Sequence, residues 1–297
     1  MITLSAFLSK IAAAIFFFIA IASLDLSAIN ISAGQISTHS IDSEYIGTRS
    51  FNIFTPAGVV LSNSTKVIYM HDGQMLFDKS NTWNNQEWMV DEVSNKVVAE
   101  NGLNFIVVGI MNAGSEKRWF EYFPQKALTV QQKEIADQEF TADNYLNFLT
   151  KELKPFLLNS MNVSRNSDDH FLMGSSMGGL ISMYGVIEEQ DEFGGFAAIS
   201  THWPGGDPDD TKELDQSIQE YLNNHFLRLS NKRIYFDYGT KTLDAYYEQY
   251  QREVDRKFSI ELQKQNRYQS IKFDGASHDE NSWSQRLHIP LEFLLDE

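Results

Sequence analysis

One hexapeptide, Gly174-Ser175-Ser176-Met177-Gly178-Gly179, restricts the possible folds of this chain more than any other feature of its sequence. It contains a Gly-x-Ser-x-Gly match centred on Ser176, follows the apolar run 171–173 and precedes 180–187, which reads as a helix. A tight strand-to-helix turn of this kind lifts a serine oxygen above a sheet, and its glycines avoid clashes with the strand and helix. The pattern therefore predicts Ser176 as a nucleophile, with the amide of Met177 facing a developing oxyanion.

The order of groups in such a site restricts the choice of histidine, because an acid and then a histidine follow the serine along the chain. Of the seven histidines, only His278 and His288 come late enough. His278 follows the alternating run 268–273, in a loop where a parallel sheet presents functional groups, whereas His288 lies in a helical pattern. We predict that His278 is the general base and that activity falls as the pH drops through roughly 6–7, because a protonated histidine accepts no proton.

Three carboxylates compete for the role of the acid. Asp237 ends the apolar segment 233–237, Asp244 follows the pair Gly239-Thr240, and Glu248 comes next. Asp244 is expected to project from a loop, whereas strand alternation points Asp237 to the opposite side of the sheet from its neighbour. Asp244 is the preferred acid, Asp237 the second candidate and Glu248 the third.

Composition excludes several classes of partner. The chain has 297 residues, 42% hydrophobic content and six prolines, which fits a globular chain with a large core. It has no cysteine, so disulfides, thiolate metal sites and an acylated cysteine are excluded. A net charge of -16 and a pI near 4.8 argue against nucleic acid and anionic membrane surfaces. We expect a small-molecule partner and neither a metal nor an organic cofactor.

Residues 1–28 have the pattern of a signal peptide. Lys10 precedes the apolar run 11–22, which is too short for a comfortable membrane span, and Leu26-Ser27-Ala28 offers a cleavage site. We predict a secreted or periplasmic protein with a mature chain of 29–297; the alternative is an uncleaved anchor.

Beyond residue 28, strand-like and helix-like segments alternate, which predicts a mainly parallel sheet with helices on both faces in a single domain. The segment 112–140 shows no clear periodicity and is expected to be a loop rich in aromatic residues. Such a loop either lines a substrate pocket or is held to the core by its aromatic side chains. The expected strands include 35–43, 47–55, 66–70 and 105–110, and the expected helices include 87–100, 141–160 and 244–264. Candidate pocket residues are His71, Arg118, Tyr122, His202 and Trp203.

Together these motifs resemble the putative-esterase family of α/β-hydrolases, which includes enterochelin esterases, S-formylglutathione hydrolases, feruloyl esterases and mycolyltransferases. The resemblance covers nearly the whole chain after residue 28. It rests on 69–77 (Tyr-Met-His-Asp-Gly-Gln-Met-Leu-Phe), Arg118 with 121–124, 174–179, Gly239-Thr240 and 275–278.

The resemblance implies an α/β-hydrolase fold, with Ser176 as nucleophile, His278 as base and the amides of Gln74 and Met177 as the oxyanion hole. The family's acid follows a Gly-Thr pair by a couple of residues; here Lys241 and Thr242 occupy those places, and the next carboxylate is Asp244. The implied activity is cofactor-free hydrolysis of a small, aryl or sugar carboxylic ester through an acyl-enzyme. An acyltransferase and a non-catalytic ligand-binding protein on the same fold are the alternatives.

Overall fold

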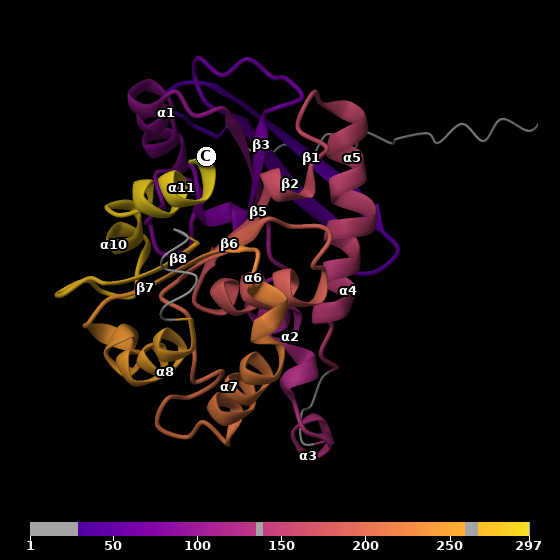
Figure 1. Ribbon diagram of the computed structural model, residues 1–297. Helices are drawn as coiled ribbons and strands as arrows, with labels where there is room; N and C mark the ends of the chain where they lie inside the picture. Colours follow the sequence, from indigo (N-terminus) through magenta and orange to yellow (C-terminus); the bar gives the residue numbers. More distant parts are fainter. Residues whose placement is uncertain (1–28, 135–138, 259–266, 297) are drawn as a thin grey trace, which may run out of the picture.

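The computed structural model describes residues 29–134, 139–258 and 267–296, and one sheet of eight strands runs through it (Figure 1). The strand order is β1-β2-β4-β3-β5-β6-β7-β8; β2 is antiparallel to β1 and β4, and the pairs from β4 to β8 are parallel. The predicted signal peptide lies outside the described residues. The strands are β1 Gln35–Ser43, β2 Gly47–Thr55, β3 Lys66–His71, β4 Phe105–Ile110, β5 His170–Ser175, β6 Gly195–Ile199, β7 Arg233–Tyr238 and β8 Tyr268–Lys272.

The inner strands are apolar along nearly their whole length because helices cover both faces of the sheet. In β5 the side chain of Leu172 joins the core on one face, whereas Phe171 and Met173 join the core on the other. The edge strand β1 alternates exposed and half-buried residues, as expected for a strand with one solvated side. Continuous apolar stretches therefore mark the inner strands of the sheet, and mixed polar and apolar stretches mark the edge.

Two groups of helices form the outer layers (Figure 1). One face carries α2 Ser115–Tyr122, α4 Ala142–Asn147 with the π-helical segment Phe148–Leu153 and α5 Lys154–Ser160, α6 Met177–Glu188, α7 Leu214–His225 and α8 Glu248–Phe258. The other carries α1 Val90–Asn101, α10 Glu280–Ser284 and α11 His288–Leu295. Within the described ranges, no helix is long and apolar enough to cross a membrane.

Most predicted elements are present, and two predictions differ from the structure. The strands 35–43 and 47–55 have the predicted bounds, and the helix expected over 87–100 begins three residues late, at Val90. The segment expected to be a loop over 112–140 instead contains α2, a 3-10 turn at Gln125–Ala127 and α3 Val130–Glu134. These helices are too short to repeat an apolar period, so contacts such as Trp119 against Phe140 stabilise them.

The helix expected over 244–264 is also different. A 3-10 helix covers Thr242–Tyr246 and α8 begins at Glu248, whereas 259–266 lie outside the described residues. The predicted acid therefore lies in a tight turn that is held by the loops beside it.

The parallel strands β3 and β5 to β8 all end at one edge of the sheet, where this architecture presents its functional groups. β3 ends at His71, β5 at Ser175 and β6 at Ile199, while β7 and β8 end at Tyr238 and Lys272. The loops that carry all the predicted catalytic residues therefore begin at the same edge.

Candidate active site

Ser176 forms the turn between β5 and α6 in a strained backbone conformation. Its φ of 58° and ψ of -121° lie in a region that residues with a Cβ rarely adopt. A Cβ on Gly174 would lie 2.8 Å from the backbone of Gly178, so the strand and helix meet this closely only with glycine at 174. Gly178 itself has room, because its nearest neighbours would be 3.5 Å away. The close contact between β5 and the start of α6 therefore depends on the first glycine of the motif.

The acid and histidine loops bring Asp244 and His278 into direct contact. His278 Nδ1 lies 2.5 Å from Asp244 Oδ1, and the Asp244 side chain is fully buried. An ionised carboxylate only accepts hydrogen bonds, so Nδ1 carries the proton and Nε2 is left as an acceptor. The predicted contact between these two side chains is present.

Gly239 allows these two loops to pack together. A Cβ at this position would lie 2.2 Å from the carbonyl oxygen of Ala276 and 2.9 Å from Asp244 Oδ2. The amides of Thr240 and Lys241 both donate to the same Ala276 oxygen at 3.0 Å. The Gly-Thr pair noted in the sequence therefore joins the acid loop to the histidine loop.

The other two acid candidates have different partners. Asp237 is fully buried and accepts two hydrogen bonds from Arg286, at 3.0 and 3.2 Å. Burial raises the pKa of Asp237, although Arg286 opposes this shift. Glu248 forms ion pairs with Arg252 and with Lys272. Neither carboxylate contacts the histidine in this structure.

The two residues whose amides are the predicted oxyanion hole both lie near the start of a helix. Met177 is the first residue of α6, and Gln74 lies in the 3-10 helix Gly73–Met75, which follows β3. The first N–H groups of a helix have no acceptor within it, so they are free to bind an anion. The segment that carries Gln74 packs against the Ser176 turn, since a Cβ on Gly178 would be 3.5 Å from Asp72 Oδ2.

Arg118 forms an ion pair with Asp72, the residue that precedes the 3-10 helix Gly73–Met75. Its Nε and Nη2 donate to the two oxygens of Asp72 at 2.6 and 2.7 Å, and Asn112 donates to the same carboxylate at 2.6 Å. Burial acts to raise the pKa of Asp72, but Arg118 outweighs it, and the pKa ends below its usual value. The guanidinium lies 5.1 Å from the centre of the Tyr122 ring, and 23% of the Arg118 side chain is exposed. Arg118 is thus the one candidate pocket residue with substantial exposure.

The four other candidate pocket residues are buried. Tyr122 and Trp203 are 0% and 1% exposed, and Trp203 Nε1 donates to Gln251 at 3.1 Å. Burial lowers the pKa of His71 to about 3 and that of His202 to about 4, so both rings are neutral at pH 7. Apart from Arg118, the candidates therefore lie behind the surface of the site rather than on it.

Three residues near the site were missed by the sequence analysis. The Tyr247 hydroxyl bonds His202 Nδ1 at 2.8 Å and also interacts with the Ser176 side chain, while its ring packs perpendicular to that of His278. Burial, reinforced by Asp244, raises the pKa of Tyr247 well above its usual value, so it stays protonated. Ser200 and Arg286 lie on the far side of Asp244.

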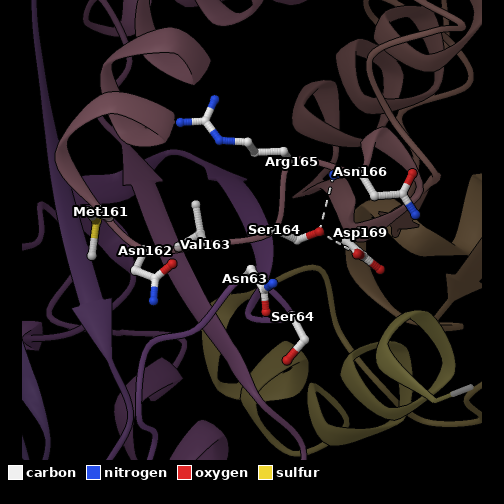
Figure 2. Close-up of a pocket in the computed structure, with 9 residues that line it drawn as sticks. All are labelled: Asn63, Ser64, Met161, Asn162, Val163, Ser164, Arg165, Asn166 and Asp169. Atoms are coloured by element: carbon white, nitrogen blue, oxygen red, sulfur yellow. Dashed lines mark hydrogen bonds between the residues drawn. The ribbon is translucent and has the colours of Figure 1, made fainter.

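Two hollows have different relations to the site. One, of about 220 Å³, adjoins Gly73 and Gln74 and is also lined by Phe77 and Met111. The other, of about 480 Å³, is lined mainly by polar residues such as Ser164 and Asp169 (Figure 2). It lies where β3 and β5 begin, and thus at the opposite edge of the sheet from Ser176. Of these two hollows, only the smaller shares residues, Gly73 and Gln74, with the candidate site, and neither is lined by Ser176, Asp244 or His278.

No group of three or more histidine, aspartate or glutamate side chains in the described part of the chain is arranged to hold a metal ion. The strained serine and the bonded histidine and acid lie on loops that leave the same edge of the sheet. The sheet order and this arrangement define an α/β-hydrolase.

The comparisons with known proteins place the chain within that class. Residues 43–293 match the model of the putative esterase family, and the chain belongs to that family. It is 26% identical to the uncharacterised protein YbbA of Bacillus subtilis (strain 168) over 172 residues, which are 57% of this chain and 62% of YbbA. The match therefore spans less than two thirds of that relative.

Solved structures agree on the fold. A ferulic acid esterase superposes with a TM-score of 0.64 at 17% identity, covering 88% of this chain and 98% of its own. The ferric enterobactin esterase of Salmonella typhimurium gives a TM-score of 0.65 at 17% identity, covering 90% of this chain and 59% of its own. At this identity the likeness concerns the fold alone.

Proposed function

We propose that this protein is a serine esterase that hydrolyses a small, aryl or sugar carboxylic ester through an acyl-enzyme. The observation that carries the proposal is the 2.5 Å contact between His278 Nδ1 and the buried Asp244, at the sheet edge where Ser176 forms its strained turn. Membership of the putative esterase family supports the reaction class.

In the proposed mechanism, neutral His278 accepts the proton of Ser176 at Nε2 as the serine oxygen attacks the ester carbonyl. Asp244 holds the tautomer and stabilises the imidazolium, while the amides of Met177 and Gln74 bind the oxyanion. His278 then protonates the departing alcohol. In the second half of the reaction, His278 takes a proton from water as the water attacks the acyl-serine, and the acid is released with Ser176 restored. The reaction needs no group beyond these residues and water.

The hollow beside Gln74 is the proposed site for one end of the ester. Its volume of about 220 Å³ is below the usual range of about 300–1,000 Å³ for drug-sized ligands, and the side chains of Phe77 and Met111 give it an apolar part. A single aromatic ring or a short acyl chain suits this size.

A fluorophosphonate probe and an ester panel test the proposal. The probe should label Ser176, as shown by peptide mass spectrometry, and the labelled protein should be inactive. The panel should contain p-nitrophenyl esters of graded length, feruloyl and acetyl-sugar esters, and S-formylglutathione. A product analysis with an added alcohol or sugar would reveal an acyltransferase, and absence of labelling with no turnover would favour a ligand-binding protein.

The choice of acid gives a separate prediction. We expect Asp244→Asn to lower kcat by about four orders of magnitude, because an asparagine no longer fixes the imidazole tautomer. Asp237→Asn should act mainly on stability, by about 1–3 kcal/mol, because it weakens a buried hydrogen-bonded pair with Arg286. Steady-state kinetics and urea unfolding of both variants separate the two effects. A larger kinetic loss in Asp237→Asn would transfer the catalytic role to that residue.

Export is also proposed, on the sequence of residues 1–28. The native protein should begin near Ile29 and occur outside the cytoplasm, because a signal peptidase would cut after Ala28. Mass spectrometry of the intact native protein measures this directly. A chain that still starts at Met1 in a membrane fraction would indicate an anchor.

A further inference from the structure

The carboxylate of Asp244 has a second side that the proposed mechanism does not use. Its Oδ1 contacts His278, whereas Oδ2 accepts hydrogen bonds from the Gly239 amide at 2.5 Å and from Ser200 Oγ at 2.6 Å. Ser200 follows β6 and is fully buried, with a φ of 45°. A serine in this strained conformation, bonded to the proposed acid, points to a role at the site.

The direction of the Ser200 hydroxyl proton follows from its neighbours. Trp283 Nε1 and Arg286 Nη2 both lie 3.0 Å from Ser200 Oγ, and both groups can only donate. They occupy the two acceptor positions of the hydroxyl, so its one proton must point to Asp244. The Ser200 hydroxyl therefore makes all three of its possible hydrogen bonds, and it links the guanidinium of Arg286 to the carboxylate of Asp244.

Asp237 fixes the other end of this chain of contacts. It accepts two hydrogen bonds from Arg286 and one from the Tyr235 hydroxyl at 3.0 Å. The single N–H of Ser200 is shared between the Asp237 side chain at 3.2 Å and the Asp237 carbonyl oxygen at 2.9 Å. The same aspartate thus orients the guanidinium and holds the strained backbone of Ser200. The Arg286 side chain is only 4% exposed, so its charge is weakly screened.

We propose that Ser200, oriented by Arg286 and Trp283, is a positioning residue for Asp244 and that it sets the basicity of the Asp244–His278 pair. The inference rests on the proposed function. Without its hydroxyl the carboxylate loses one of three donors and becomes a stronger base, which stabilises the imidazolium. Ser200 touches no reacting atom and acts only through Asp244.

The histidine has other charged or titratable neighbours, and none of them is changed in the test. Asp244 contacts it directly, Tyr247 packs against its ring, and His202 acts on it electrostatically. Asp279 and Glu280 follow it in the chain; Asp279 caps the start of α10, and Glu280 accepts a hydrogen bond from Asn84.

The decisive measurement is the pH dependence of kcat and of kcat/KM for p-nitrophenyl acetate with the mature protein. In Ser200→Ala, kcat should fall about ten- to hundredfold with little change in KM, because Asp244 no longer holds the His278 ring in its aligned orientation. The acidic midpoint should move up by several tenths of a pH unit. In Asp237→Asn it should move down, because a negative charge is removed while Arg286 remains.

Ser164 offers a matched control. It is also buried and donates to a carboxylate, Asp169, at 2.5 Å (Figure 2), but it lies at the opposite edge of the sheet. Ser164→Ala should therefore leave kcat and the midpoint as in the wild type. If Ser200→Ala does not fold, Ser200→Gly removes the same hydroxyl and relieves the backbone strain, and the same kinetic result is expected.

The outcomes separate this inference from the function on which it rests. Equal kcat and midpoint in Ser200→Ala and Ser164→Ala would overturn the inference, as would midpoints that move the same way in Ser200→Ala and Asp237→Asn. If Ser176→Ala keeps wild-type activity, the proposed function itself fails. Loss of activity in Ser176→Ala together with opposite midpoint shifts supports both.

Discussion

Replacing Ser176 by alanine is expected to lower kcat for an activated ester about a million-fold. Loss of the nucleophile leaves only the oxyanion hole and substrate binding to act, and losses of this order are typical of triad enzymes. Alanine keeps the Cβ, so the strained turn with its φ of 58° is changed little. Hydrolysis of p-nitrophenyl acetate and thermal unfolding of the same preparation measure the two properties separately.

The neighbouring serine provides the control. Ser175 is the last residue of β5, is 6% exposed, and should tolerate alanine with most of the activity retained. If Ser175→Ala is the inactive variant and Ser176→Ala hydrolyses the ester, the nucleophile has been assigned to the wrong residue of the turn.

His278→Ala is expected to be as severe as the serine variant. Groups that act as one unit lose nearly the whole rate when either is removed, because the serine has no other base. His202 cannot replace it, since its two ring nitrogens bond the Tyr247 hydroxyl and the carbonyl oxygen of Gly206. Kinetics at several pH values, with the same ester, measure the effect.

His288→Ala is the matched control for the base. His288 is exposed at the start of α11, and its replacement should leave most of the activity. The opposite order of the two histidine variants would place the base in the C-terminal helix. Because the pKa of His71 is about 3 and that of His202 about 4, neither explains a loss of activity between pH 7 and 6.

The parts of the site that could be predicted are those encoded over short stretches of chain. The strand–turn–helix unit around Ser176 follows from one hexapeptide, and the preference for Asp244 follows from its place after a strand. The contact between Asp244 and His278 confirms the predicted geometry, whereas the catalytic roles remain predictions. The alternation argument for Asp237 agrees with the structure. Phe236 lies in the core on one face of the sheet, and Tyr235, on the same side of β7 as Asp237, lies in the core on the other face.

The parts that could not be predicted depend on long-range contacts. Ser200 and Arg286 are 86 residues apart in sequence, and no local pattern marks a serine as the link between a guanidinium and an acid. Aromatic residues of the same type occur in cores and in pockets, so the burial of Tyr122 and Trp203 had no local signal. Short helices such as α2 are likewise stabilised by tertiary packing more than by their own sequence.

The buried neutral histidines have a consequence for storage and handling in acid. His71, His170 and His202 are buried, and burial lowers their pKa values to about 3, 4 and 4. In the unfolded chain such rings titrate near 6.5, so below that pH the unfolded state binds more protons and the folded state loses stability. Each pH unit from about 6 down to about 4 then removes up to about 1.4 kcal/mol per histidine. Acid should therefore inactivate this protein in two ways: a rapid, reversible loss as the base is protonated, and a slower loss as the core opens, which returning to neutral pH restores only if the chain refolds.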